Sequence, residues 1–197
     1  MDDRSFFDKI APDWDANEIL STPEKINQIL DYFDLNSGDS ILDLGTGTGV
    51  LLPYLAERIG TAGNITAVDF SKEMLKIAKA KYESIHPKPS FLNLDIENET
   101  IPGEYDKIIL YCVYPHFHTP VETLKWLQKV NLKPKGQIFI AFPCSADFIN
   151  NIHKERHSDS DVLVSPEELT EFLCKNDFNA TSIGLAENDY VVRISQP

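Results

Sequence analysis

The sequence is poor in cysteine and contains no long apolar run. Its three cysteines, at positions 112, 144 and 174, are widely spaced and form no Cys-x-x-Cys pair, a pattern typical of free thiols in a reducing compartment. The longest apolar runs, such as Ile138–Phe142, are far too short to cross a bilayer. The acidic start, residues 1–3, lacks the basic and apolar regions of a secretory signal. We therefore expect a cytoplasmic protein without membrane insertion.

Basic side chains are also scarce, because 18 lysines and arginines face 31 acidic residues, for a net charge of −13. Nucleic-acid binding depends largely on neutralising phosphates with lysine and arginine, so we expect no nucleic-acid partner. The lysines between Lys72 and Lys88 have the spacing of a solvated helix face. A chain of 197 residues is long enough for one domain without disulfide or metal staples.

Strand and helix patterns alternate from Ser40 onward. Strands are expected at 41–44, 65–68, 91–94, 107–113 and 137–142, with helices at 50–59, after Ser71 and at 121–132. A helix with a capping box at Ser165 follows, and then two β-like runs, 180–185 and 190–194, close enough for an antiparallel hairpin. The sequence therefore predicts an α/β, Rossmann-like, doubly wound, mostly parallel sheet of seven strands that ends in an antiparallel hairpin.

The first part of the chain has a different pattern. Residues 2–35 read as helical, and within them Thr22 is a predicted N-cap followed by Pro23 at the first helical position. Residues 36–39 read as a stop and turn. We therefore divide the chain into an N-terminal helical lid segment, 1–39, and a domain at 40–197.

A glycine-rich turn follows the first predicted strand, where residues 43–49 read Asp-Leu-Gly-Thr-Gly-Thr-Gly. Glycines at such a turn let a ligand approach the backbone closely. The nicotinamide fingerprint needs a third glycine where Val50 stands, and no Lys-Ser or Lys-Thr follows as in a phosphate-binding P-loop. The spacing therefore indicates a nucleotide-like ligand held in another way.

Acidic residues also follow the next two predicted strands. Asp69 ends the second strand, where a carboxylate can accept both hydroxyl hydrogens of a ribose. Asp95 follows the third strand at the same edge of the sheet and could accept an adenine amino group. With Asp43, these acids place three carboxylates at successive strand ends, which favours a ligand site over three unrelated loop residues.

Together these motifs resemble those of the class I S-adenosylmethionine-dependent methyltransferases, over nearly the whole chain. The resemblance rests on residues 41–49, 67–71 with 74–75, 93–95, 105–109 and 132–137. Residues 6–15 also look like the branch that contains the ubiquinone and menaquinone biosynthesis methyltransferases. The predicted terminal hairpin is similar to the sixth and seventh strands that distinguish this family from nicotinamide dehydrogenases. The resemblance implies that 40–197 is a methyltransferase domain with S-adenosylmethionine as cofactor and S-adenosylhomocysteine as product.

Carried over residue by residue, the resemblance implies roles for the glycine turn and its acids. Gly45, Gly47 and Gly49 would contact the methionine and ribose portions of the cofactor. Asp43 would help hold the methionine end, and Asp69 the ribose diol.

The resemblance also implies an adenine site. Asp95 would accept the adenine amine, and Ile96 would lie nearby. Phe70 and Met74 would pack on the adenine ring. Tyr111, at the end of the fourth predicted strand, is expected beside the cofactor.

The segment after the fourth strand is expected to face the transferable methyl group. His116 is a candidate general base, because the pKa of histidine lies near working pH. Further residues are expected to line a flat, apolar acceptor pocket closed by the N-terminal segment, namely Trp14, Tyr114, Phe117, His118 and His153.

A metal site is the sharper alternative for the histidines, since His153 and His157 are spaced i, i+4 and Cys144 could join them. His-x-x-x-His alone is a weak signal, and we expect no metal.

We interpret the chain as a methyltransferase that acts on a small-molecule acceptor by direct displacement. One alternative is a non-catalytic S-adenosylmethionine-binding regulatory module. Another is an RNA or protein methyltransferase, which would need a basic surface that the composition does not indicate. The oligomeric state does not follow from the sequence.

Overall fold

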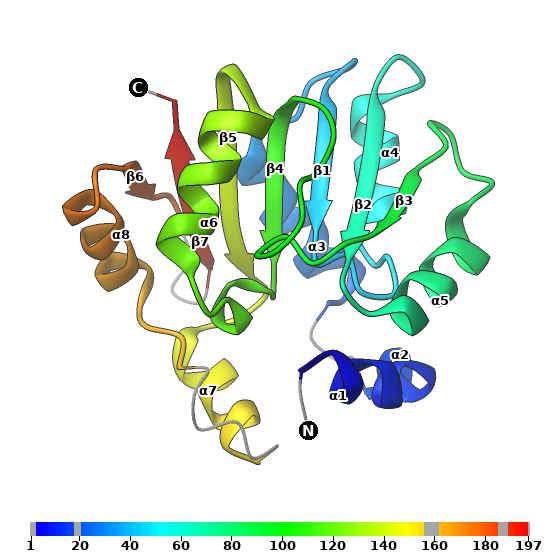
Figure 1. The fold of residues 1–197 in the computed structure, drawn as a ribbon, viewed down its shortest axis with the longest axis horizontal. Coiled ribbons are helices and arrows are strands. Elements are labelled where there is room, and N and C mark those ends of the chain that lie inside the picture. Colours follow the sequence, from blue (N-terminus) through cyan, green and yellow to red (C-terminus); the bar gives the residue numbers. More distant parts are fainter. Residues whose placement is uncertain (1–2, 18–20, 156–161, 185–188, 197) are drawn as a thin grey trace.

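The computed structural model describes residues 3–17, 21–155, 162–184 and 189–196. Its centre is a seven-stranded sheet with the strand order β3-β2-β1-β4-β5-β7-β6 (Figure 1). The first five strands are parallel, and β7 pairs antiparallel with both β5 and β6. This confirms the predicted fold class, including the antiparallel ending. The strands are β1 (Ser40–Leu44), β2 (Asn64–Asp69), β3 (Ser90–Asn93), β4 (Tyr105–Tyr111), β5 (Leu132–Phe142), β6 (Asn179–Ser182) and β7 (Tyr190–Ser195).

Helices cover both faces of the sheet because the strands are apolar on both faces. Along β4, Ile108 and Leu110 belong to one apolar core, while Ile109 and Tyr111 belong to the other. One core includes apolar residues of the helices α3 (Pro23–Leu30) and α4 (Leu52–Ile59). The other includes those of α6 (Pro120–Trp126), α7 (Ala146–Glu155) and α8 (Pro166–Lys175). A further helix, α5 (Lys72–Tyr82), packs beside β2 and β3.

The predicted helix starts are confirmed at the level of single hydrogen bonds. The side chain of Thr22 accepts from the backbone N–H of Lys25, and that of Ser71 accepts from Met74. Ser165 and Glu168 form both hydrogen bonds of a capping box at the start of α8. Each cap satisfies backbone donors that the first turn of a helix leaves without an intrahelical partner.

The structure differs from the prediction between α6 and β5. The last part of the expected 121–132 helix is a π-helical turn, Leu127–Asn131, and β5 begins at Leu132 rather than at 137. The buried side chain of Asn131 donates to the carbonyls of Ile101 and Gly103, each at 2.9 Å. These long-range bonds fix the chain where local propensity alone predicts continued helix.

The N-terminal segment is helical in pieces and not continuously. It contains α1 (Asp3–Ile10), a 3-10 turn (Ala11–Asp13) and α2 (Trp14–Asn17), and a second 3-10 turn (Asp31–Phe33) follows α3. Pro12 lies at the first break, where proline suits a helix start but not a helix interior. In Figure 1, α1 and α2 lie beneath the carboxyl ends of β1 and β2. This position is the edge where open α/β sheets bind ligands.

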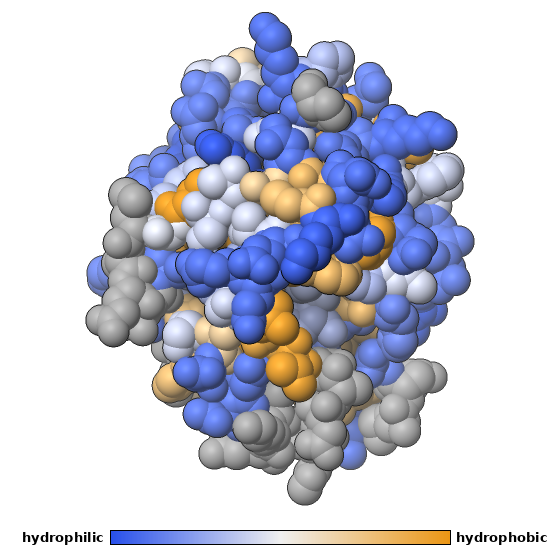
Figure 2. Space-filling model, turned by 90° about the vertical axis from the view of Figure 1, so that its left-hand side faces the viewer, coloured by the Kyte–Doolittle hydropathy of each residue, from blue (hydrophilic) through white to orange (hydrophobic). Residues whose placement is uncertain are grey.

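The face of the molecule that carries α8 is mainly hydrophilic, with apolar side chains reaching the surface in places (Figure 2). The exposed large apolar residues on α7, on α8 and just before α8 are Phe148, Val162, Val164 and Phe172. Within the described ranges, no helix is long and apolar enough to span a membrane.

Candidate functional site

The glycine turn between β1 and α4 needs glycine for two different reasons. Gly45, Gly47 and Gly49 all have positive φ angles, of 71°, 56° and 86°. A Cβ on Gly45 would lie 2.5 Å from the side chain of Val113, so this position is closed by packing. A Cβ on Gly47 would meet nothing within 4 Å, so this position opens onto free space. The turn is therefore tightly packed at its start and accessible at its centre.

Asp43 lies under the turn and is only 2% exposed. Its Oδ2 accepts a hydrogen bond of 2.6 Å from the hydroxyl of Thr46. Burial raises the pKa of Asp43 to about 7, and repulsion from Asp69 adds to the effect. A cation placed beside this carboxyl would therefore stabilise its ionised form.

Asp69, at the end of β2, joins the glycine turn to the start of α5. Its Oδ2 accepts from the backbone N–H of Gly47 and its Oδ1 from that of Ser71, both at 2.8 Å. Burial raises the pKa of Asp69 to about 6; these hydrogen bonds oppose the rise, and the charge of Asp8 adds to it. Asp69 is therefore a second buried carboxylate, and it is hydrogen-bonded to the same glycine turn that covers Asp43.

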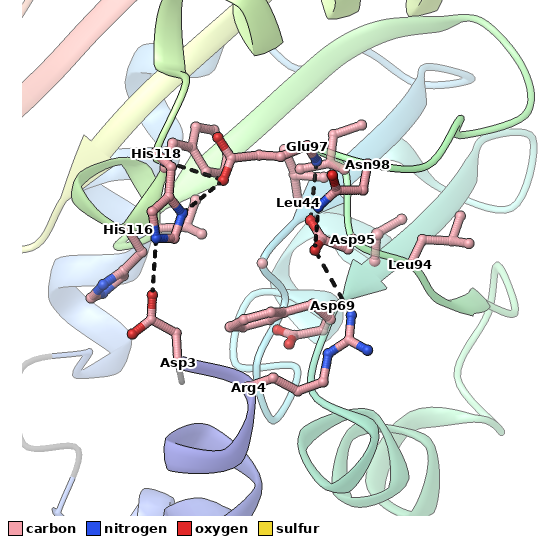
Figure 3. A pocket seen from close by; sticks show the side chains of 16 residues that line it. Asp3, Arg4, Leu44, Asp69, Leu94, Asp95, Glu97, Asn98, His116 and His118 are labelled. Carbon is pink, nitrogen blue, oxygen red and sulfur yellow. Dashed lines mark hydrogen bonds and ion pairs between the residues drawn. The ribbon is translucent and has the colours of Figure 1, made fainter. Parts of the chain in front are cut away.

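Asp95 follows β3 and faces the same space (Figure 3). Its carboxylate accepts hydrogen bonds from the backbone of Glu97 and the side chain of Asn98. The guanidinium of Arg4, from α1, lies 3.9 Å from the Asp95 carboxylate and 6.0 Å from the centre of the Phe70 ring. Residues from the N-terminal segment and from the sheet edge therefore meet at this site.

Two adjoining cavities run along this edge. The larger, of about 630 Å³, is lined by Asp95, Ile96, Phe117 and His118 among others, and the smaller, of about 110 Å³, by Asp43, Gly47, Met74, Tyr111 and Trp14. They share the lining residues Gly45, Asp69, Phe70, Val113 and His116. The volume of the larger cavity falls within the range of small-molecule sites, roughly 300–1,000 Å³.

Some residues selected from the sequence lie away from these cavities. Gly49 packs against Leu52 and Tyr82 and lines neither cavity. Tyr114 is buried in the core beside Phe117 and also lines neither. His153 belongs to α7, but its side chain lies outside what the structure describes, as does the whole of His157.

Phe7 is the centre of an aromatic cluster at the junction of the cavities. Its ring makes edge-to-face contacts with Phe70, Trp14 and His116, at centroid distances of 5.7, 5.9 and 5.3 Å. His116, which lines both cavities, is thus covered by a ring from α1. The sequence pattern identified Phe7 as part of a closing segment but gave no indication of this pairing.

Glu97 is a site residue that the sequence did not reveal. Its carboxylate accepts from the backbone N–H and from the hydroxyl of Thr119. It also accepts from the backbone N–H and from the ring of His118 (Figure 3). Burial alone would raise the pKa of Glu97, but these hydrogen bonds outweigh it and lower the pKa below its usual value. Glu97 therefore fastens the loop after β4 to the loop after β3.

Asp8, Asp15 and Ser21 were also missed, because no local pattern marks their partners. They bond to Ser71, Thr48 and Tyr111, which lie far away in the sequence. Among the residues described, no group of three or more His, Cys, Asp or Glu side chains is arranged to hold a metal ion.

Comparison with known proteins identifies relatives of one kind. The profile of a family described as "Methyltransferase domain" matches residues 35–179. The malonyl-[acyl-carrier protein] O-methyltransferase of Priestia megaterium is 35% identical over 133 residues, which are 68% of this chain and 45% of that protein. The 2-phytyl-1,4-naphtoquinone methyltransferase of a Nostoc species is 36% identical over 91 residues, 44% of this chain and 40% of that protein. The match thus spans less than half the length of these curated relatives.

Solved structures show the same fold. A SAM-dependent methyltransferase from Aquifex aeolicus aligns over 100% of both chains with a TM-score of 0.74 and 20% identity. The magnesium protoporphyrin IX methyltransferase of Synechocystis, solved with bound SAM, covers 100% of this chain and 98% of its own with a TM-score of 0.68 and 14% identity.

Proposed function

The chain belongs to the class I S-adenosylmethionine-dependent methyltransferases, and from this premise we propose that it methylates a small-molecule acceptor by direct displacement. The proposal rests mainly on the three carboxylates at the carboxyl ends of neighbouring strands, namely Asp43 in β1, Asp69 at the end of β2 and Asp95 just after β3. Each of the three lines at least one of the two adjoining cavities, and Asp69 lines both. This set of acceptors fits a ligand with a cationic end, ribose hydroxyls and an amino-substituted ring.

The residues present fit S-adenosylmethionine on two further grounds. Asp43 and Asp69 are buried with raised pKa values, so a cationic ligand group would relieve the cost of their charge. The space beside Gly47 admits a ligand against the backbone. When bound, S-adenosylmethionine supplies a methyl group activated by a positively charged sulfur.

We assign the cofactor-binding roles by position along the sheet edge. Asp43, with the glycine turn at Gly45 and Gly47, holds the methionine end, and Asp69 accepts the ribose hydroxyls. Further along, Asp95 accepts the adenine amine, while Phe70 and Ile96 cover the ring faces. Met74 and Tyr111 line the smaller cavity, so Met74, which the resemblance implied would pack on the adenine ring, is instead proposed to contact the methionine end beside Tyr111.

His116 is the proposed general base. It lies where the two cavities meet, so its ring can reach a nucleophile beside the methionine end. There it would accept the proton that the acceptor loses as the methyl group is transferred. Phe7, which packs against His116, would exclude water from this position.

The acceptor is proposed to be uncharged where it meets the methyl group. The described residues that line the smaller cavity include the carboxylates Asp43 and Asp69 but no lysine or arginine. An acceptor carboxylate would therefore enter without a cationic side chain beside it, next to two buried acids. The two relatives illustrate the alternatives, because one is named for malonyl-[acyl-carrier protein], whose malonyl group carries a carboxylate, and the other for an uncharged phytyl naphthoquinone. The aromatic rings of Phe7, Trp14 and His116 favour a flat, aromatic acceptor with a hydroxyl nucleophile over a malonyl group.

Turnover with matched acceptors tests this proposal. The purified protein is incubated with S-adenosylmethionine and a dihydroxynaphthalene, a malonyl thioester or RNA, and S-adenosylhomocysteine is quantified. We expect product with the dihydroxynaphthalene, and at least about tenfold less with His116→Ala. Turnover of the malonyl thioester alone would contradict an uncharged acceptor. Cofactor binding without turnover of any acceptor would favour a non-catalytic binding module.

A further inference from the structure

Two carboxylates of the N-terminal segment accept short hydrogen bonds from the residues around the site, and Asp8 is the first of them. Its Oδ1 accepts a hydrogen bond of 2.6 Å from the Ser71 hydroxyl and one of 3.2 Å from the backbone N–H of Glu73. Ser71 is fully buried and also bonds to Asp69 through its backbone N–H. Asp8 therefore joins α1 to the start of α5. Ser71 connects it to Asp69, the proposed ribose-binding carboxylate.

Asp15 makes the second connection, to the glycine turn and to α5. Its Oδ1 accepts a hydrogen bond of 2.7 Å from the hydroxyl of Thr48, and its Oδ2 pairs with the Lys81 ammonium at 2.5 Å. Thr48 is 2% exposed and stands between Gly47 and Gly49 of the glycine turn. Although burial alone would raise the pKa of Asp15, its hydrogen bonds to Lys81 and Thr48 lower it, so the carboxylate is charged at neutral pH.

The two connections hold aromatic rings across the site. Phe7 immediately precedes Asp8, Trp14 immediately precedes Asp15, and both rings line the smaller cavity. With both connections made, that cavity measures about 110 Å³, well below the roughly 300–1,000 Å³ typical of ligand pockets. A methionine chain enclosed in such a space would lie against Phe7 and Trp14.

We propose that Asp8 and Asp15 are positioning residues that hold the N-terminal segment shut over bound cofactor, so that breaking either connection speeds cofactor exchange. The inference rests on the proposed function, because it assumes that S-adenosylmethionine occupies these cavities. Neither carboxylate contacts the reacting atoms. Each acts through its neighbouring aromatic ring and through the residue that it bonds, Ser71 or Thr48.

The rate of cofactor release tests this role, and its measurement does not require the acceptor to be known. Protein loaded with radiolabelled S-adenosylmethionine is diluted into excess unlabelled compound, and the label retained on a filter is followed with time. Because hydrogen bonds to charged groups are strong, we expect Asp8→Ala and Asp15→Ala each to speed release by about tenfold. The matched control is Asp31→Ala, which removes an exposed carboxylate paired with Arg58 outside the site and should leave release unchanged.

A double-mutant cycle separates positioning from a general loss of structure. Thr48→Val removes the donor to Asp15, and Thr48→Ser keeps it. If the pair acts as a unit, Asp15→Ala with Thr48→Val releases cofactor no faster than the faster single variant, and Thr48→Ser behaves like the wild type. Multiplying effects in the double variant would contradict the pairing.

Trp14 supplies an independent readout of the segment's position. The chain has two tryptophans, so Trp126→Phe leaves Trp14 as the single reporter. Saturating S-adenosylhomocysteine should protect Trp14 from acrylamide quenching, and Asp8→Ala and Asp15→Ala should reduce that protection. If the wild type binds neither S-adenosylmethionine nor S-adenosylhomocysteine, the proposed function fails. If it binds both but release and quenching are unchanged in the variants, only the positioning role fails.

Discussion

Two buried carboxylates, Asp43 and Asp69, both line the smaller cavity, and burial holds the pKa of each above its usual range. Their pKa values of about 7 and about 6 lie close to working pH. The two residues were identifiable from their places at strand ends, because parallel strands bring their carboxyl ends to one edge. Their altered acidity was not, since it depends on packing by residues distant in the sequence.

Cofactor affinity should depend on the ionisation of Asp43. Only the carboxylate attracts a cationic ligand, so binding should weaken as the pH falls below about 7, approaching tenfold per pH unit, and Asp69 should extend the loss below about 6. Titration with S-adenosylhomocysteine from pH 5.5 to 7.5 measures this slope. Asp43→Asn should bind weakly and almost evenly between pH 6.5 and 7.5. An equally steep slope in that variant would show that another group is responsible.

The same residue should limit the stability of the unliganded protein. Because the folded pKa of about 7 exceeds the ordinary 3.8, the neutral Asp43 carboxyl is tolerated below pH 3.8, and that benefit is lost as the pH rises through 7. Asp43→Asn should therefore raise Tm at pH 8 by several degrees, at roughly 1.4 kcal/mol per pKa unit, and have little effect at pH 4. Thermal unfolding at both pH values checks this, and a lower Tm at pH 8 would contradict it.

Gly45 and Val113 form a packing pair whose effect can be separated from ligand contact. An alanine at Gly45 would meet the Val113 side chain at 2.5 Å, so Gly45→Ala should lower stability by about 1–3 kcal/mol. Adding Val113→Ala should recover part of that loss, although the positive φ of 71° keeps some strain. Urea unfolding of the single and double variants measures the recovery. No recovery would mean that the contact with the Val113 methyl group does not by itself require glycine, since the Val113 Cβ at 2.8 Å and the positive φ both remain.

Among the elements, those with a local signal were predicted well and those fixed by distant contacts were not. The caps at Thr22, Ser71 and Ser165 each bond to the backbone only three residues further on, so the local sequence predicts them. Each starts a helix where expected. The early start of β5 at Leu132 was missed, since it follows from pairing with Tyr105 and from the hydrogen bonds of Asn131. Local periodicity carries no information on such contacts.

The connection between α6 and β5 should therefore depend on one side chain. Asn131→Ala removes the donors to Ile101 and Gly103 in a fully buried position, which should destabilise the fold by about 2–4 kcal/mol. Chemical unfolding measures the loss, and Gln128→Ala, a half-buried neighbour with a longer bond of 3.3 Å to Ser195, is the control. Equal effects in both variants would deny Asn131 a special role.

At the scale of the whole molecule, the fold follows from the alternation of strands and helices, and the site from three acids at one edge. The N-terminal segment is where sequence reasoning reached its limit. A helical, aromatic closing segment was expected at 1–39, but its attachment through Asp8 and Asp15 depends on pairs separated by many residues. Such pairs are properties of the folded molecule and leave no periodic pattern in the chain.

Calorimetric titration shows whether the acidic edge of the sheet holds S-adenosylmethionine. The purified protein is titrated with S-adenosylmethionine, S-adenosylhomocysteine and NAD, beside Asp69→Ala and the surface control Asp31→Ala. We predict binding of the first two compounds only, weakened at least about tenfold by Asp69→Ala and unchanged by Asp31→Ala. Binding of NAD in their place, or equal affinity in Asp69→Ala, would contradict this role of the acidic edge.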